Sequence, residues 1–364
     1  KMKVSKLMEF NREQIEKNFR ERIKGLSSVF GPSGFEEEVA ELIKQNLADS
    51  DFTHSTDVLG NLIYHRKGTG DKKILIASHM DEIGLIIRHI DSKGFIWVDT
   101  LGGFAPQQFF GKRVIIKTDE GKHINGIINS LHLGRPDRCT TMPSSVHEFF
   151  IEVGCESRQE VLELGIEEDN AVSIDYPVIE LGKYKLGGKA LDDRALVFIL
   201  EEVVRLLQGR EDIPDLYAVF TTQEEVGARG AIVAATNIKP DIAIALDMSL
   251  ATDIPGVPES EYINVLGKGT SIKVMDKLST CIGGLIAHPQ LVRDLKKVTK
   301  DNQIPYGIEA YAAGATDASF MQTLNGGIIA GGVQIPMRYV HSYEVVDVRD
   351  VVDTVELLYR YILT

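Results

Sequence analysis

Five short segments of the chain carry imidazole and carboxylate side chains that could act together on a divalent metal ion. Their residues are His79 and Asp81, Asp192, Glu224 and Glu225, Asp247, and His341. Nitrogen and oxygen donors of these types are ligands that Zn²⁺ and similar ions take in proteins. Taken singly, each segment has a commoner structural interpretation, such as a helix cap, a solvated turn or a strand end. The prediction of a metal site therefore rests on their combination.

Two imidazoles and three carboxylates form the expected ligand set, namely His79, Asp192, Glu225, Asp247 and His341. This set suits two borderline divalent ions, with Zn²⁺ or Co²⁺ as the leading candidates. The three carboxylates contribute −3 against +4 from two such ions. The remaining positive charge favours a bridging hydroxide at neutral pH, which would be the nucleophile of a hydrolytic reaction.

Glu224 and Asp81 are expected to support catalysis without binding metal. Adjacent side chains on an extended segment point in roughly opposite directions, so Glu225 can face a metal ion while Glu224 faces the substrate as a general base. Asp81 stands two residues after His79 and could hold the imidazole through its second ring nitrogen. Such a contact would fix the tautomer of a metal-binding histidine.

Three other functions fit the same residues less well. A glycoside hydrolase needs two carboxylates facing each other across a sugar, roughly 5 to 9.5 Å apart, whereas Glu224 and Glu225 are neighbours that point apart. A non-catalytic peptide-binding or assembly protein would be expected to have a degraded metal site, but here every ligand position is filled. A serine hydrolase of the G-x-S-x-G type lacks its motif in this sequence.

Strands and helices alternate in the parts of the chain that carry these residues. Apolar runs predict buried strands over 73–77, 216–220 and 241–246. Helical periodicity predicts helices over 35–48, 192–207, 289–303 and 346–363. The first of these helices would begin with a capping box of Ser33 and Glu36. This alternation predicts an α/β fold, a three-layer α/β sandwich with a mostly parallel central sheet. Open α/β sheets bind ligands beyond the carboxyl ends of their strands, where most of the candidate residues stand.

Between residues 84 and 179 the pattern changes to short β-rich pieces separated by turn residues. In the second α/β part, after this region, a further strand is predicted at 327–330. We therefore predict a small β-barrel-like insert over 84–179. It would interrupt a catalytic domain made of two chain segments, 1–83 and 180–364.

The composition limits the partners of the chain. Its 364 residues are 43% hydrophobic and 26% charged, which is typical of a globular protein and excludes a disordered one. The 53 acidic residues outnumber the 40 basic ones, giving a net charge of −13. An acidic surface repels phosphate backbones and anionic lipid, so we expect neither nucleic acid nor a membrane as a partner.

Cysteine content and the absence of long apolar runs indicate the compartment. The three cysteines, Cys139, Cys155 and Cys281, are too few for a disulfide framework and fit a reducing compartment. The first 20 residues are charged throughout and lack the apolar centre of a signal peptide. We therefore expect a cytoplasmic protein.

Several motifs together resemble a known family of enzymes, the dinuclear metallo-aminopeptidases that include the glutamyl aminopeptidases, the deblocking aminopeptidases and the tetrahedral aminopeptidase particles. Some members carry an endoglucanase name. The motifs occur in the family's order and extend across nearly the whole chain. They are Gly31-Pro-Ser-Gly-Phe-Glu-Glu-Glu38, Ser78-His-Met-Asp-Glu-Ile-Gly84, Gly188-Lys-Ala-Leu-Asp-Asp-Arg194, Gln223-Glu-Glu-Val-Gly-Ala-Arg-Gly-Ala231, Ala315-Thr-Asp-Ala318 and Ile335-Pro-Met-Arg-Tyr-Val-His341.

The resemblance implies a role for each candidate residue. His79 and Asp247 would hold one metal ion, Glu225 and His341 would hold the other, and Asp192 would bridge the two. Glu224 would be the general base and Asp81 would orient His79.

The resemblance also implies the reaction and the assembly. The substrate would be a short peptide, hydrolysed at its N-terminal peptide bond. The β-rich insert would serve in assembly of a homo-oligomer, which in this family is commonly a hollow particle of twelve subunits.

Overall fold

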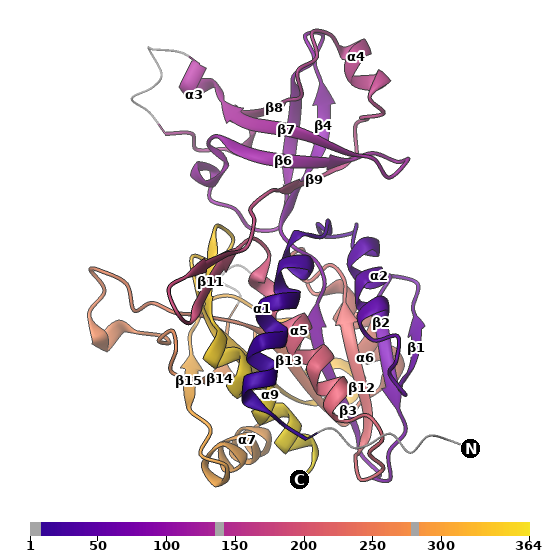
Figure 1. Cartoon of the computed structure of the whole chain (residues 1–364), viewed down its shortest axis with the longest axis vertical. Coiled ribbons are helices and arrows are strands. Elements are labelled where there is room, and N and C mark those ends of the chain that lie inside the picture. Colours follow the sequence, from indigo (N-terminus) through magenta and orange to yellow (C-terminus); the bar gives the residue numbers. More distant parts are fainter. Residues whose placement is uncertain (1–8, 135–141, 278–283) are drawn as a thin grey trace.

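A computed structural model describes residues 9–134, 142–277 and 284–364. These residues form an α/β body with a β-barrel standing on one end of it (Figure 1). Cys139 and Cys281 lie outside the described residues, among which Cys155 is a free thiol. Across the described part of the chain, no helix combines the length and the apolar character that a membrane crossing requires.

The α/β body is built on a sheet that has eleven strands among the described residues. Nine of them follow one another across the sheet in the order β1 (Thr53–Thr56), β2 (Leu62–Arg66), β12 (Asp215–Thr221), β3 (Lys73–His79), β13 (Ile242–Leu250), β16 (Ile329–Arg338), β17 (Glu344–Asp347), β11 (Lys185–Gly188) and β10 (Ile179–Leu181). Beside this path, β14 (Thr270–Met275) pairs with both β16 and β15 (Tyr306–Ala310).

The four central strands β12, β3, β13 and β16 are parallel, and the strands on either side of them are antiparallel. In β3 every residue after Lys73 is buried, as expected of a strand covered on both faces. The carboxyl ends of these parallel strands meet at one edge of the sheet. Ligands bind at such an edge in open α/β folds.

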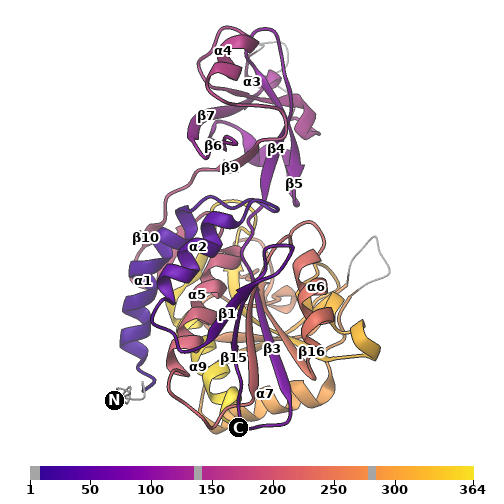
Figure 2. The same ribbon diagram turned by 90° about the vertical axis from the view of Figure 1, so that its right-hand side faces the viewer.

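Helices cover both faces of the sheet (Figure 2). One face packs against α1 (Arg12–Ser28), α2 (Glu37–Asn46), α5 (Leu191–Leu206), α7 (Pro289–Asp301) and α9 (Val348–Ile362). The other face packs against α6 (Arg229–Ile238) and α8 (Asp317–Met321). The predicted three-layer sandwich is thus confirmed, with parallel pairing among the four central strands and between β14 and β15.

The insert is a closed antiparallel barrel with its own apolar core. Its strands follow one another around the barrel as β4 (Gly84–Ile90), β5 (Ile96–Leu101), β8 (Phe149–Glu152), β7 (His123–Ser130), β6 (Lys112–Lys117) and β9 (Ala171–Ile174). Two short helices, α3 (Leu131–Gly134) and α4 (Arg158–Glu163), lie between its strands in the sequence. The barrel-like insert is confirmed, and the division of the chain at residues 84 and 179 stays a proposal.

Two local predictions were wrong. The strand expected at 327–330 is the beginning of β16, which continues to Arg338. Asp247 was expected directly after its strand, but β13 runs on to Leu250 and so includes it. In both cases the strand is longer than the apolar run, because its later residues pair with neighbouring strands whatever their polarity.

Candidate metal centre

One group of donor atoms lies where β3, β13 and the start of α5 meet. It consists of His79, Asp192, Asp193 and Asp247, whose ligand atoms all lie within 4.8 Å of one another. All four residues are buried. We call this group the first cluster.

A second group shares Asp192 with the first. The ligand atoms of Asp192, Glu225 and His341 also lie within 4.8 Å of one another. Nε2 of His341 is 3.1 Å from Oε1 of Glu225 and 3.6 Å from Oδ2 of Asp192. Glu225 follows β12, and His341 lies in the turn between β16 and β17. We call this group the second cluster, and it meets the first at the residue expected to bridge two ions.

Asp193 belongs to the first cluster although the sequence analysis gave it no role. Its Oδ2 accepts hydrogen bonds from Oγ of Ser78 at 2.6 Å and from the backbone N–H of His79 at 3.0 Å. Its Oδ1 is buried and has no hydrogen-bond partner among the residues that the structure describes. The sequence signal that could have identified Asp193 is its position directly after Asp192. In the structure, neither residue has helical backbone angles at the start of α5.

Three successive backbone N–H groups hold the loop that carries the two glutamates. The N–H of Gln223 donates to Oε1 of Glu36 at 3.0 Å. The N–H of Glu224 donates to Oδ1 of Asp81 at 2.9 Å, and that of Glu225 to Oδ2 of Asp81 at 3.1 Å. Two carboxylates from other parts of the chain therefore fix the backbone on which Glu224 and Glu225 stand. Charged acceptors make such hydrogen bonds stronger than neutral ones.

These contacts also show that the capping box predicted for α2 was wrong. Oγ of Ser33 donates to Oδ2 of Asp81 at 2.6 Å, and Oε1 of Glu36 accepts from the N–H of Gly34 at 2.8 Å. The helix begins at Glu37, too late for Ser33 to cap it. Ser33 instead supports Asp81 after the end of β3, and Glu36 supports the loop that carries Glu224 and Glu225.

The ring of His79 is held from both sides. Its Nδ1 lies 3.0 Å from the backbone oxygen of Asp81 and 3.4 Å from Oδ1 of the same residue. Its Nε2 lies 3.2 Å from Oδ1 of Asp192. This arrangement leaves Nε2 directed at the first cluster while Nδ1 faces Asp81, so the backbone oxygen of Asp81 is at least as important to the ring as its carboxylate.

The environment of His341 includes both the barrel and the sheet. Its Nδ1 lies 2.7 Å from the backbone oxygen of Gly103, which follows the barrel strand β5. Its backbone N–H donates to Oε1 of Glu344 at 2.9 Å. Oε2 of Glu344 accepts from the backbone N–H of Asp192 at 3.0 Å. No motif in the sequence indicates Glu344, because its contacts join segments that lie far apart in the chain.

The electrostatics of the site fit a bound cation. Burial and repulsion from Asp192 raise the pKa of Asp247 well above its usual value. Burial likewise raises the pKa of Asp317, which receives a hydrogen bond from Thr221, to about 6. Oδ1 of Asp193 and Oδ1 of Asp317 are both buried without a hydrogen-bond partner. Buried carboxylates in this number are costly unless a positive charge compensates them, and a divalent ion would supply it.

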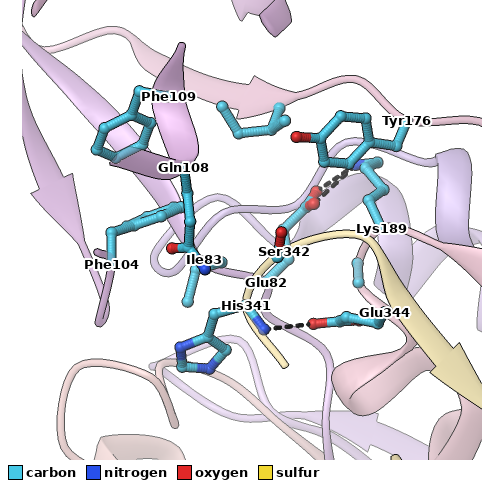
Figure 3. A pocket seen from close by; sticks show the side chains of 12 residues that line it. Glu82, Ile83, Phe104, Gln108, Phe109, Tyr176, Lys189, His341, Ser342 and Glu344 are labelled. Carbon is cyan, nitrogen blue, oxygen red and sulfur yellow. Dashed lines mark hydrogen bonds and ion pairs between the residues drawn. The ribbon is translucent and has the colours of Figure 1, made fainter. Parts of the chain in front are cut away.

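A pocket opens beside the second cluster, between the barrel and the sandwich (Figure 3). His341 lies at its edge, and Phe104 and Phe109 of the barrel segment contribute apolar surface. Nζ of the buried Lys189 lies 2.7 Å from each carboxylate oxygen of Glu82 at the opposite side. The pocket therefore places apolar surface next to a candidate metal ligand.

Comparison with known proteins places this chain among peptidases. The sequence profile of the family described as M42 glutamyl aminopeptidase matches residues 60–357. A protein of Acetivibrio thermocellus is 35% identical over 94% of this chain and 98% of its own length. The lysyl aminopeptidase of Pyrococcus furiosus is 32% identical over 90% of this chain and 92% of its own.

Solved structures agree with the sequence comparison. An aminopeptidase from Desulfurococcus kamchatkensis has a TM-score of 0.90 and 37% identity, covering 95% of each chain. The TET1 peptidase of Pyrococcus horikoshii, with a TM-score of 0.82 and 28% identity over 94% of this chain and 99% of its own, is described as assembling into a tetrahedron or a large octahedral shell. A Thermotoga maritima protein named endoglucanase has a TM-score of 0.74 and 28% identity, covering 93% of this chain and 96% of its own.

Proposed function

Because the chain belongs to the M42 glutamyl aminopeptidase family, we propose that it is a metal-dependent aminopeptidase that removes N-terminal residues from short peptides. The observation that carries this proposal is the convergence of two donor clusters on Asp192, beside the loop that carries Glu224. The arrangement unites two possible metal positions with a candidate base.

The residues of the two clusters would hold two divalent ions, Zn²⁺ or Co²⁺. His79, Asp192 and Asp247 would hold one, and Asp192, Glu225 and His341 the other. When bound, these ions would polarise the scissile carbonyl and lower the pKa of a water molecule. Asp193 would hold the backbone of His79 in place through the hydrogen bond that it accepts.

Glu224 is the proposed general base. Its carboxylate would take a proton from the attacking water and deliver it to the nitrogen of the departing amine. Burial, together with repulsion from Asp247 and Glu225, raises its pKa well above the usual value, which favours proton uptake near neutral pH. Asp81 would keep Glu224 in position by accepting the hydrogen bond from its backbone N–H.

The alternative of a glycoside hydrolase is not favoured by the site. The endoglucanase name belongs to a related protein, and the two adjacent glutamates here have separate surroundings: Glu225 contacts His341, whereas Glu224 does not belong to either cluster of the described residues. Two carboxylates opposed across a sugar would be required instead.

A panel of aminoacyl p-nitroanilides tests the proposed function. Each substrate is assayed with the chelated protein and after addition of Zn²⁺, Co²⁺ or Mn²⁺. We expect nitroaniline release from substrates with a free amino terminus, loss of activity after chelation and recovery with at least one metal. N-acetylated versions of the same substrates serve as the matched control and should not be cleaved. Cellulose hydrolysis that survives chelation, with no peptidase activity, would contradict the proposal.

We also propose that the chain forms a homo-oligomer, with the barrel as the assembly element and twelve subunits as the expected number. The support is the assembly described for the Pyrococcus horikoshii TET1 peptidase and a second structure with the TET1 name, PhTET1-12s, described as a dodecamer. We propose short peptides as the partners, because an acidic protein with a net charge of −13 repels the phosphates of nucleic acid and anionic lipid. A reducing, cytoplasmic location is proposed from the sparse cysteines.

A further inference from the structure

We propose that Glu344 is a positioning residue that fixes two of the three donor segments of the second cluster and thereby sets its affinity for a metal ion. This inference rests on the proposed function, because it concerns the same metal centre. It assigns a role to a residue outside both clusters of the described part of the chain.

Both carboxylate oxygens of Glu344 are already used by backbone donors. Oε2 accepts the N–H of Asp192 at 3.0 Å. Oε1 accepts the N–H of His341 at 2.9 Å (Figure 3). The residue is 2% exposed, so water does not compete for these contacts. A carboxylate whose two oxygens each face an N–H group is a support for the backbone and not a free ligand.

The sheet explains how one side chain reaches both segments. Glu344 is the first residue of β17 and pairs with Gly188 at the end of β11, shortly before Asp192. On its other side, β17 pairs with β16, which leads into the turn that carries His341. Glu344 therefore stands between the two donor segments because the strands that deliver them are its neighbours in the sheet.

The backbone N–H groups of Asp192 and His341 both gain from an acceptor side chain at this point. The N–H of Asp192 lies in the first turn of α5, where backbone donors have no partner within the helix. His341 has a positive φ of 62°, a conformation that its surroundings must hold in place. The two hydrogen bonds that Glu344 accepts satisfy the first requirement and support the second.

The third donor segment has an equivalent support. The backbone N–H of Glu225 is held by Asp81, so all three donors of the second cluster have a carboxylate bound to their own backbone N–H. Supports of this kind order the ligands before the ion arrives. Their loss in metal sites typically lowers affinity about 10- to 100-fold.

The test is a titration of the metal-free, full-length protein with Co²⁺, followed by calorimetry and by the visible absorption of the bound ion. The wild type should bind two equivalents. Glu344→Ala removes both acceptors and should weaken the equivalent of the second cluster about 10- to 100-fold. The equivalent of the first cluster depends on Glu344 only through Asp192 and should weaken less. Glu344→Gln keeps one acceptor oxygen and should lose less affinity than Glu344→Ala. If the alanine variant does not fold, the glutamine variant alone should still weaken one equivalent.

Asp347 offers a matched control within the same strand. It is also a fully buried carboxylate of β17, but it caps α9 and binds Arg349, away from the metal centre. Asp347→Asn should lower thermal stability and leave both Co²⁺ affinities unchanged. The proposal is overturned if the folded Glu344 variants bind both equivalents like the wild type, or if Asp347→Asn causes the same loss. A wild type that binds two equivalents but cleaves no peptide would contradict the proposed function while leaving this inference standing.

Discussion

The smallest units of this site are carboxylates that bind backbone rather than metal. Asp81, Glu36 and Glu344 each accept two backbone N–H groups, and together they hold the segments around Glu224, Asp192 and His341. Errors of about 1 Å in the placement of catalytic groups can lower rates about 100-fold. The precision of the site therefore depends on residues that do not touch a substrate.

Replacement of Glu224 tests the base itself. Glu224→Gln keeps the shape of the side chain but removes its ability to take a proton. We expect kcat to fall about 10²- to 10⁴-fold while the metal content stays at the wild-type level. Steady-state kinetics and elemental analysis of the same preparation measure both quantities. Near-normal turnover in a fully loaded variant would show that Glu224 is not the base.

Replacement of Glu36 tests the support of the glutamate loop. Glu36→Ala removes the acceptor for Gln223, so the loop should lose its fixed position and kcat should fall at least about 10-fold with little change in KM. Glu36→Gln retains the accepting oxygen and is the matched control, expected within a few-fold of the wild type. Equal kinetics for the two variants would exclude a positioning role for that oxygen.

The residues that could be predicted from the sequence are those that belong to short local motifs. All five expected ligands are found in the two clusters, although their roles remain proposals. Asp193, Glu344 and the true contacts of Ser33 and Glu36 were not predicted. Their partners are backbone groups far away in the chain, and no spacing within a motif indicates such a contact.

At the scale of elements, the apolar strands were easy to predict and the short or polar ones were not. β1 and β10 are exposed along their whole length, so they carry no pattern of burial. In β16, Gly331 and Gly332 resemble the end of a strand. A Cβ atom at Gly331 would lie 2.9 Å from the side chain of Leu291, and one at Gly332 would lie 3.0 Å from that of Lys273, so a larger residue at either position would have to displace a neighbouring side chain.

Asp215, the first residue of β12, leads to a prediction of how the stability of the protein depends on pH. Asp215 accepts hydrogen bonds from Lys67 at 2.8 Å and faces His65 at 2.7 Å. Burial alone would raise the pKa of Asp215, but these two partners outweigh burial and lower it from 3.8. The stabilising effect of the carboxylate is therefore complete above about pH 3.8 and is lost as the pH falls through the lowered value.

Asp215→Asn should accordingly lower the free energy of unfolding by about 1–2 kcal/mol at pH 7. The difference from the wild type should shrink as the pH is lowered below about 4. Urea unfolding at several pH values measures it. Asp212→Asn, at an exposed carboxylate paired with Arg210, is the control and should have almost no effect. A deficit for Asp215→Asn that grows toward low pH would contradict the assigned sign.

At the scale of the whole molecule, the barrel and the sandwich are joined by a buried ionic contact. Nζ of Lys189 binds both carboxylate oxygens of Glu82 at 2.7 Å and donates to Oγ of Ser173 at 2.8 Å. Ser173 belongs to the barrel strand β9, whereas Lys189 precedes α5 and Glu82 follows β3. One ammonium group thus links the segment before α5 to two others, the end of β3 and the barrel strand β9.

Lys189→Met should be destabilising because it removes the nearest cation from the buried Glu82 carboxylate, which keeps contacts only at longer range, with Gly31 and Ser173 at 3.2 Å and Arg194 at 3.8 Å. We expect a loss of at least about 2 kcal/mol in the free energy of unfolding, measured by urea denaturation. Lys297→Met removes an exposed ion pair with Asp301 and should cost less than about 0.5 kcal/mol. If both variants lost the same small amount, the contact would not be a structural link between barrel and sandwich.

The position of the barrel within the chain also has a consequence for biosynthesis. β3 ends at residue 79, and its neighbours β12 and β13 begin at residues 215 and 242. The ribosome must therefore add 215 − 79 = 136 residues before the first neighbour starts to emerge. At about 5–20 residues per second this takes roughly 7 to 27 s, during which the barrel can close but an apolar strand of the sandwich has two unpaired edges. Variants that slow the synthesis of β12 or β13, or the pairing of these strands with β3, should thus reduce the yield of folded protein in cells. They should have a smaller effect on the stability of the finished molecule.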